Sequence, residues 1–491
     1  MQLMFDTGSM VDYERFLRLK KTPAYQWRGE IAVVPDEYAA WIDGRERHLP
    51  DADYTPSPFL FDYQRDVARL AIRKRKFAVF ADCGLGKTLL LLEFAIHAAK
   101  SGGKVLIVSP LMVVRQTLAE AARFYPGLPV QHIKAADLAG WLTNGRDGIG
   151  ITNYEAIRDD LPDAKLTALL LDESSLLKSH YGAWGTRLIE LGRGVPYKLA
   201  LTGTPAPNDR IEYANHAVFL DHFRTTNEFL ARYFVNKGQT QERWILKPHA
   251  LQPFYRDLSH WCIFLSDPSV YGWSDNCGTI PPIHVHIETV PLTPEQRKAV
   301  QQITGGLMMG DAGGIGQRSK LSQVAKGTSG GGSIETLKPD FIRNLVASWP
   351  NESTIVWCHY NAEQESMERV FGDAAVSIDG STPEETRLRM IDDFKAGRVR
   401  ILISKPRILG FGLNLQIATR QVFSGLQDSY EEFYQAVKRS NRVGSTRPLN
   451  VHIPVTEIEE PMVANVLRKA DRVQADTEEQ ERLFKEMAWT F

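Results

Sequence analysis

The sequence predicts an α/β protein with two tandem domains, each built on a parallel β-sheet, and three observations lead to this prediction. The chain has 491 residues, which is too long for one ordinary domain. Two regions each contain five short apolar runs that alternate with helical stretches, as buried parallel strands do. A less regular, glycine-rich segment lies between these regions. Because 43% of the residues are hydrophobic, the chain can build both cores.

The first region covers residues 57–215 and follows an N-terminal accessory segment, residues 1–56, in which a small helix is expected over 13–25. Its expected strands are short, continuous and bounded by Gly, Pro or polar residues. They are residues 77–80, 105–108, 149–151, 168–171 and 198–201.

The second region covers residues 339–456 and repeats the pattern. Its expected strands are residues 355–357, 376–378, 399–403, 421–423 and 451–453. Residues 216–338 are predicted to be a helical or irregular insertion and linker. Glycine clusters at 305–316 and 327–332 favour a hinge between two moving lobes, with a surface loop of no importance as the alternative. Residues 457–491 are charged and helix-prone, and a C-terminal helix on the second domain is expected.

Composition excludes several classes of protein. The 58 Lys and Arg against 59 Asp and Glu give a net charge of −1, which excludes a histone-like polycation but not a local basic groove. The N-terminus lacks the layout of a signal peptide, and no apolar run approaches the roughly 20 residues that cross a bilayer. No Cys-x-x-Cys pair is present, which argues against a zinc ribbon and against a disulfide framework. These features predict a soluble protein of a reducing cytosol.

A phosphate-binding loop is predicted after the first strand. The segment Ala81-Asp82-Cys83-Gly84-Leu85-Gly86-Lys87-Thr88 lies between that strand and an apolar helical run. Glycines let backbone N–H groups close on phosphates, and the helix N-terminus favours an anion. Lys87 would reach the β- and γ-phosphates, and the Thr88 hydroxyl would ligate Mg²⁺. Ala81 stands where such loops usually begin with Gly, and Cys83 is expected to be a small packed side chain rather than a redox group.

An acid pair follows the strand at 168–171. Asp172 occupies the position at which this kind of fold holds Mg²⁺, and Glu173 would polarise the attacking water as general base. Without the preceding apolar strand and the phosphate loop upstream, an Asp-Glu pair would be explained equally well as a helix N-cap. The segment Leu201-Thr202-Gly203-Thr204-Pro205, again at a strand end, is suited to sense the γ-phosphate.

In this order the segments resemble superfamily 2 helicases and translocases, most closely the Swi2/Snf2-like branch. In the first lobe, residues 60–64 resemble the Q motif, whose Gln64 would read the adenine, and residues 81–88 resemble motif I. Ser109-Pro110 and 152–155 resemble the strand-contacting motifs, while 172–178 and 201–208 resemble motifs II and III.

In the second lobe, residues 357–360 resemble motif IV and residues 379–382, with Arg387 and Phe394, resemble the next Snf2 block. Residues 410–416, which include Gly412, resemble motif V, and residues 435–444 resemble motif VI. Arg439 and Arg442 are expected on one helix face, aimed at a cleft with the first lobe. The residue sequences of motifs I and V are similar to those of compact Snf2-like helicases of bacteriophages and prophages.

The resemblance implies two RecA-like lobes and an ATP-dependent motor on double-stranded DNA, with ATP hydrolysed between the lobes. ATP and Mg²⁺ are the implied cofactors, and Thr88 and Asp172 the implied metal ligands. The implied catalytic residues are Lys87, Asp172, Glu173, Arg439 and Arg442. The implied nucleotide-binding residues are Gln64, Ala81, Asp82, Cys83, Gly84, Leu85, Gly86, Lys87, Thr88 and Gly412. The DNA backbone contacts are assigned to Ser109, Thr152, Ser381, Arg387, Lys405 and Asn414.

The chain also departs from the family pattern. Motif II ends in Ser174-Ser175, where many relatives carry a His that couples ATP to nucleic acid, and motif VI continues into Gly444-Ser445 rather than ending in Gln. Two alternatives therefore stay open: a strand-separating helicase on single-stranded DNA or RNA, and an ATP-switched DNA-binding module without motor activity. Phage or host replication and recombination proteins are the expected partners, in a bacterial cytosol or nucleoid.

Overall fold

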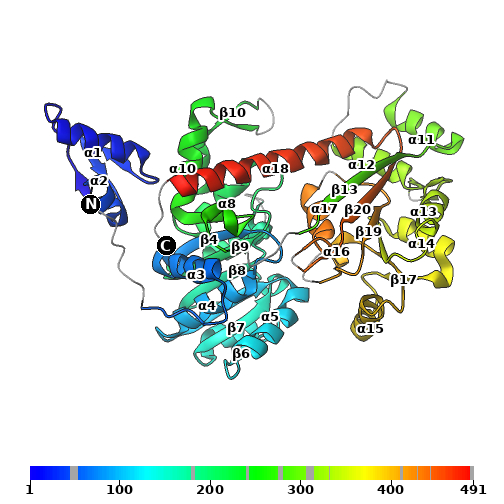
Figure 1. Cartoon of the computed structure of the whole chain (residues 1–491), viewed down its shortest axis with the longest axis horizontal. Coiled ribbons are helices and arrows are strands. Elements are labelled where there is room, and N and C mark those ends of the chain that lie inside the picture. Colours follow the sequence, from blue (N-terminus) through cyan, green and yellow to red (C-terminus); the bar gives the residue numbers. More distant parts are fainter. Residues whose placement is uncertain are drawn as a thin grey trace. The chain divides into compact units, whose positions relative to one another are not determined.

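The computed structural model describes residues 1–44, 53–178, 183–238, 243–274, 280–305, 315–330, 332–409, 413–427, 429–442 and 444–486. The chain divides into two compact units (Figure 1). Unit 1 consists of Met1–Asn276 together with Val473–Phe491, and unit 2 consists of Cys277–Arg472. The two-domain prediction is therefore confirmed, although the chain is divided at other residues than expected.

Unit 1 is built on a seven-stranded sheet among its described residues, and every neighbouring pair of strands is parallel. In sheet order the strands are β12 (Cys262–Leu265), β4 (Lys76–Ala81), β9 (Tyr197–Thr202), β8 (Leu166–Asp172), β5 (Lys104–Ser109), β7 (Gly148–Asn153) and β6 (Val130–His132). All five strands expected in this region are present. Their apolar runs are continuous because both faces of a parallel sheet are covered.

Helices of unit 1 connect and cover these strands (Figure 1). They are α3 (Asp62–Lys74), α4 (Lys87–Ala99), α5 (Leu111–Phe124), α6 (Leu138–Asn144), α7 (Ala183–Leu191), α8 (Tyr213–Phe219), α9 (Thr226–Tyr233) and α10 (Leu251–Trp261). A two-stranded hairpin, β10 (Phe234–Asn236) with β11 (Trp244–Leu246), follows α9. One buried cluster joins the sheet to α8, α9 and α10 through residues such as Phe80, Phe219 and Phe254.

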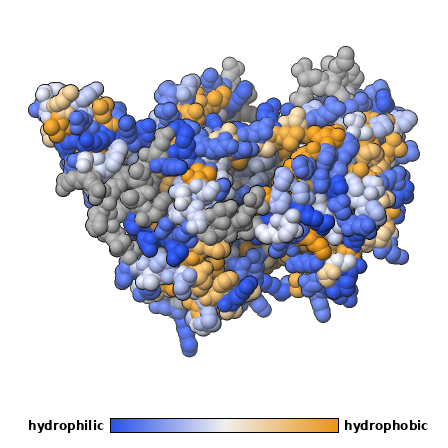
Figure 2. Space-filling view, viewed as in Figure 1, coloured by the Kyte–Doolittle hydropathy of each residue, from blue (hydrophilic) through white to orange (hydrophobic). Residues whose placement is uncertain are grey.

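The N-terminal segment forms a small α/β element of its own within unit 1. Its sheet order is β1-β3-β2, and it contains β1 (Gln2–Leu3), α1 (Met10–Lys21), β2 (Gln26–Arg28), β3 (Ile31–Val33) and α2 (Ala39–Ile42). Tyr38 joins the segment to α10 through a 2.6 Å hydrogen bond with His260 Nδ1, and Glu37 forms a 2.7 Å ion pair with Lys74 of α3. Figure 2 shows apolar side chains on the surface of this segment, and those of Met4, Met10 and Val11 are more than 60% exposed.

Unit 2 is built on a second parallel sheet, of six strands among its described residues. In sheet order they are β13 (Ile283–Thr289), β20 (Leu449–Val455), β19 (Arg420–Phe423), β16 (Thr354–Trp357), β18 (Ile401–Ser404) and β17 (Ala375–Ile378). Its helices are α11 (Pro294–Thr304), α12 (Ile315–Ala325), α13 (Lys338–Ala347), α14 (Asn361–Phe371), α15 (Glu384–Lys395), α16 (Pro406–Leu409) and α17 (Tyr430–Val437). The five expected strands are again present.

The region predicted to be an insertion and linker is shared between the two sheets. Its strand β12 pairs with β4 in unit 1, and its strand β13 pairs with β20 in unit 2. The boundary between the units falls at residues 276 and 277, upstream of both glycine clusters. Within the second cluster a short hairpin forms, β14 (Thr328–Ser329) with β15 (Gly332–Ser333), inside unit 2, while residues 306–314 lie outside the described residues.

The C-terminal helix also differs from the expectation. Helix α18 (Glu460–Glu486) begins in unit 2, but from Val473 onward it belongs to unit 1 rather than to the second domain. No helix in the described part of the chain is both long and apolar enough to pass through a membrane.

Candidate functional site

The predicted phosphate loop lies at the carboxyl end of β4, between that strand and α4. Gly84 and Gly86 adopt positive φ angles of 93° and 69°, which residues with a side chain rarely adopt. A Cβ atom at Gly86 would lie 2.2 Å from the Gln64 amide nitrogen, so close approach also requires Gly there. The loop therefore turns tightly enough to present its N–H groups at the N-terminus of α4.

Lys87 is the first residue of α4 and folds back over the loop. Its Nζ atom donates to the carbonyl oxygens of Ala81 at 2.8 Å and Asp82 at 3.1 Å. The ammonium group is thus held at the loop, where it can meet phosphate oxygens.

Helix α3 braces the loop from the other side. Tyr63 donates its hydroxyl to the Leu85 carbonyl at 3.2 Å, and Gln64 donates its amide to the same oxygen at 3.4 Å. Gln64 also accepts from the Phe61 N–H at 3.0 Å, and only 2% of its surface is exposed. Gln64 therefore positions the phosphate loop in this structure, and its contact with adenine stays a prediction.

Asp172 lies at the end of β8 and is almost completely buried. Ser109 of β5 donates its hydroxyl to Asp172 Oδ2 at 3.1 Å, and Tyr154 donates to the Asp172 carbonyl at 2.8 Å. Burial, followed by the neighbouring Glu173, raises the pKa of Asp172 to about 6, while Lys87 and Ser109 act in the opposite direction. A buried carboxylate with a raised pKa is stabilised by a nearby cation, so Asp172 fits a divalent metal ion. Thr88, the second residue of α4, stays the other predicted ligand.

Glu173 has a strained backbone. Its φ and ψ of 56° and 54° lie in the left-handed region, which costs a residue with a Cβ atom about 1–2 kcal/mol. The carboxylate accepts from Thr202 Oγ1 at 2.7 Å and from Ser175 Oγ at 3.2 Å. Thr202 Oγ1 also accepts from the Thr204 N–H at 3.1 Å. The predicted general base is thus hydrogen-bonded to the predicted γ-phosphate sensor.

Helix α8 and the turn before it hold the two segments that follow β8 and β9, through residues that lie outside the predicted motifs. His216, fully buried, lies 3.1 Å from Ser174 Oγ through its Nε2 atom, and Asn215 donates to the Leu177 carbonyl at 2.6 Å. Glu212 accepts from the N–H and side-chain amide of Asn208 at 2.9 and 3.0 Å. Burial lowers the pKa of His216 to about 4, so the imidazole is neutral at physiological pH. The chain therefore places a histidine beside motif II from a distant helix, and no local motif signals it.

Arg439 and Arg442 of unit 2 are not on a helix face as predicted, because α17 ends at Val437. They lie in the turns that follow, yet both guanidinium groups donate to the Leu413 carbonyl, at 3.4 and 3.5 Å. The turn is closed by a 3.2 Å bond from the Arg442 N–H to Ser445 Oγ. The two arginines are thus neighbours because they share the Leu413 carbonyl, and not because they lie on one helix face. The predicted nucleotide-binding residue Gly412 lies outside the described residues.

The residues assigned to DNA fall into two groups. Ser109 and Thr152 are fully buried, and their hydroxyl groups donate to Asp172 and to the Ile133 carbonyl, so both act inside unit 1. The other four are all in unit 2 and are exposed or half-buried: Ser381, Arg387, Lys405 and Asn414. Within that group, Ser381 donates to Asp379 at 2.9 Å, and Arg387 donates to the Thr382 carbonyl at 3.1 Å.

Two further features of the sequence have structural partners. In the basic run at 73–76, Lys74 pairs with Glu37 and Lys76 with Asp221. His286 bonds to Asn450 at 3.0 Å and stacks on His452 at 4.6 Å. Across the described residues, no group of three or more His, Cys, Asp or Glu is arranged to hold a metal ion.

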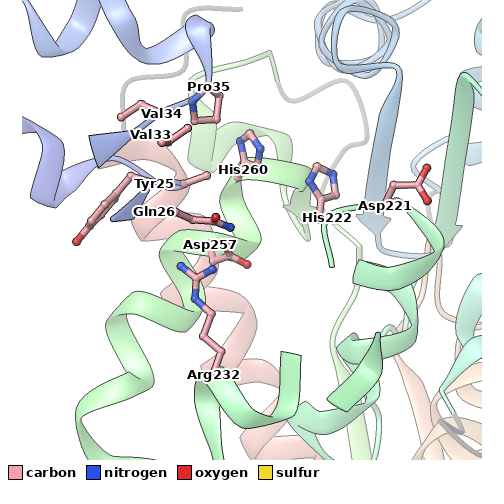
Figure 3. Close-up of a pocket in the computed structure, with 11 residues that line it drawn as sticks. Tyr25, Gln26, Val33, Val34, Pro35, Asp221, His222, Arg232, Asp257 and His260 are labelled. Carbon is pink, nitrogen blue, oxygen red and sulfur yellow. The ribbon is translucent and has the colours of Figure 1, made fainter. Parts of the chain in front are cut away.

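A cavity of about 380 Å³ lies away from the phosphate loop, between the N-terminal segment and the region of α9 and α10. Figure 3 shows Tyr25 and Gln26 of the N-terminal segment, with Asp257 next to Gln26 and with His260 and His222 further along the lining. Burial raises the pKa of Asp257 and lowers the pKa of both histidines. This cavity is not part of the site around Lys87 and Asp172.

The fold and the site define a P-loop protein with a second parallel-sheet unit. The chain belongs to the SNF2-related family: residues 63–330 match the SNF2-related domain, and residues 337–444 match the helicase conserved C-terminal domain. The predicted resemblance is therefore confirmed.

Several relatives are similar over most of the chain. The mouse (Mus musculus) protein called DNA annealing helicase and endonuclease ZRANB3 is 24% identical over 92% of the chain and 43% of its own length. The putative ATP-dependent helicase/translocase YwqA of Bacillus subtilis is 22% identical over 76% of the chain and 43% of its own length. Putative protein p41 of Acyrthosiphon pisum secondary endosymbiont phage 1 is 24% identical over 81% of the chain and 92% of its own length. The chain thus spans less than half of the first two relatives.

Among solved structures, the Sulfolobus solfataricus SWI2/SNF2 ATPase core in complex with dsDNA is 19% identical. The match covers 88% of this chain and 98% of that chain, with a TM-score of 0.40.

Proposed function

We propose that this SNF2-related protein hydrolyses ATP and uses the energy to move along double-stranded DNA. The observation that carries the proposal is the acid pair beside the phosphate loop, in which Asp172 is buried and Glu173 is half-buried. Asp172 lies in the field of Lys87, and Glu173 is hydrogen-bonded to Thr202. A cation-binding carboxylate, a phosphate-binding lysine and a positioned general base are the groups that phosphoryl transfer to water requires.

Each residue has a separate role in this proposal. The loop N–H groups and Lys87 bind the β- and γ-phosphates, and Thr88 and Asp172 hold Mg²⁺, which would supply charge neutralisation at the phosphates. Glu173 orients the attacking water and accepts its proton. Because Glu173 and Thr202 share a hydrogen bond, loss of the γ-phosphate would alter both motifs at once.

Unit 2 would contribute positive charge and DNA contacts. Arg439 and Arg442 share the Leu413 carbonyl, and a guanidinium at the γ-phosphate stabilises the transition state by roughly 10³–10⁵-fold in rate. The polar groups of Ser381, Arg387, Lys405 and Asn414, which are exposed or half-buried, would contact the DNA backbone rather than the bases. Such contacts suit movement through any sequence.

The family membership supports a motor, and the relatives named as helicases and translocases support ATP dependence. The steady-state ATPase rate tests which nucleic acid this protein acts on. The rate is measured alone and with duplex DNA, single-stranded DNA or RNA, at matched low ionic strength, because phosphate contacts weaken steeply with salt.

Stronger stimulation by duplex than by single strands is the expected result. Stimulation by single strands or RNA alone would replace the proposal with a strand-separating helicase. ATP binding without turnover under any of these conditions would replace it with an ATP-switched binding module.

A further inference from the structure

The last part of helix α18 packs onto the sheet of unit 1, although it comes from the far end of the chain. Leu483 and Phe484 are only 6% and 2% exposed, and Leu483 belongs to the core of that unit. Asp476 accepts two hydrogen bonds from the Arg210 guanidinium, at 2.5 and 3.1 Å, and one from Tyr255 at 2.8 Å. This part of α18 is therefore a fixed component of unit 1.

Glu481 connects this helix to the end of strand β12. Its Oε1 atom accepts from the Ser266 N–H at 2.6 Å and from the Ser266 hydroxyl at 2.7 Å. The side chain is nearly buried, with 3% of the residue exposed, and burial raises the pKa of Glu481. A buried carboxylate that accepts two bonds from one residue holds that residue tightly.

Ser266 is adjacent to a direct contact with the phosphate loop. The preceding residue, Leu265, accepts at its carbonyl from the Asp82 N–H at 2.9 Å. Asp82 is the first loop residue after β4, and its own carbonyl accepts from Lys87. A displacement of Ser266 would therefore move the start of the loop.

A second connection runs through aromatic side chains to helix α3. The Phe484 ring meets Tyr271 edge-on at 5.8 Å, and Tyr271 lies 5.2 Å from Trp273. Trp273 donates its indole N–H to Asp66 at 2.8 Å, and the next residue, Ser274, donates its N–H to Asp62 at 2.8 Å.

Helix α3 completes this path. The Tyr63 ring lies 6.4 Å from Trp273, and its hydroxyl, together with the Gln64 amide, holds the Leu85 carbonyl of the phosphate loop. Both ends of the phosphate loop are thus tied to the segment 265–274, which α18 holds in place.

We propose that residues 473–486 of α18 position the phosphate loop for nucleotide binding, through Glu481 at Ser266 and through Phe484, Tyr271 and Trp273 at α3. These side chains lie outside the phosphate loop and act through Ser266 and α3, so they are positioning residues. The inference rests on the proposed function in one respect, that the loop binds ATP.

The test compares Glu481→Ala with Glu479→Ala in the full chain. Glu479 is on the same helix and forms an ion pair with Arg482, three residues further along it, so it controls for changes in the helix itself. Loss of both bonds to Ser266 is expected to raise the KM for ATP and the Kd for a fluorescent ADP about three- to tenfold, with kcat changed less than twofold. Glu479→Ala is expected to leave both values unchanged. Glu481→Gln, which retains an acceptor oxygen, is expected to restore KM to within about twofold.

A second variant keeps the inference testable if Glu481→Ala fails to fold. Trp273→Phe retains the ring beside Tyr63 and removes the bond to Asp66, and a rise in KM of about threefold is expected. Unchanged KM in folded Glu481→Ala and Trp273→Phe would overturn the inference. An equal fall of kcat and kcat/KM would also overturn it, since this indicates a defect in chemistry and not in nucleotide binding. Failure of the wild-type chain to bind ADP would instead overturn the proposed function.

Discussion

The pKa of Asp172 allows the metal assignment to be tested by pH. Burial, together with Glu173, raises this pKa from 3.8 to about 6. The folded protein therefore binds a proton at Asp172 at pH values where the unfolded chain has released it. Stability from this group is complete below pH 3.8 and is lost as the pH rises through about 6. The difference of about two pK units corresponds to about 3 kcal/mol.

The perturbation is Asp172→Asn, which removes the charge at nearly constant volume. At pH 7.5 the ionised, buried Asp172 destabilises the nucleotide-free wild type, so the variant is expected to be more stable by up to about 3 kcal/mol. The advantage is expected to fall to about 1 kcal/mol at pH 4.5 and to vanish below pH 3.8, where Asp172 is protonated in both the folded and the unfolded chain. Because His216 also titrates, with a pKa lowered to about 4, only the difference between the two proteins isolates Asp172.

Binding of Mg²⁺ and nucleotide gives the opposite dependence. The metal ion requires the ionised carboxylate, of which about a tenth remains at pH 5 when the pKa is about 6. The Kd of Mg²⁺-ADP is thus expected to rise about tenfold between pH 7.5 and pH 5 in the wild type. In Asp172→Asn it should be weak throughout and depend on pH only through the phosphates of the nucleotide.

The assays are thermal denaturation of the two proteins from pH 4.5 to 7.5, and titration of fluorescent ADP with and without Mg²⁺. The reasoning is refuted if Asp172→Asn is less stable than the wild type at pH 7.5. It is also refuted if the variant binds Mg²⁺-ADP as tightly as the wild type does.

Three further predictions concern the other residues of the site. Lys87→Ala is expected to abolish hydrolysis, because the loop then has no ammonium group for the phosphates, and normal phosphate release would contradict the assignment of the loop. Arg442→Ala should bind ATP like the wild type but lose DNA-stimulated turnover; wild-type turnover would transfer the role to Arg439, which donates to the same carbonyl. Ser174→Ala removes the hydrogen bond to His216 and is expected to lower kcat about three- to tenfold with the Kd for ADP unchanged. In that third case an unchanged kcat would show that His216 has no part in positioning Glu173.

The fold was predictable from the sequence because each buried parallel strand corresponds to a short, continuous run of apolar residues. The runs around Phe77, Val105 and Leu169 are continuous and apolar, since both faces of the sheet are covered, and each was predicted within a few residues. Short or exposed strands have no such signature. β6 has only three residues, and all seven residues of β13 are exposed or half-buried and of mixed polarity, so the sequence predicts neither strand.

The site was predictable where its chemistry depends on neighbours in the chain. The phosphate loop and the acid pair are contiguous segments, because a strand, a turn and a helix N-terminus must follow one another to bind phosphate. Arg439 and Arg442 were placed correctly beside each other but on the wrong element, since a spacing of three also fits a turn.

Tertiary structure alone decided which distant residues serve these segments. His216 approaches Ser174 from 42 residues away, and Glu481 approaches Ser266 from 215 residues away. A hydrogen bond between such residues leaves no periodicity or spacing in the sequence, because its geometry depends on how helices pack on the sheet. The sequence determined which groups we propose to bind and hydrolyse a nucleotide, and packing determined which side chains hold those groups in position.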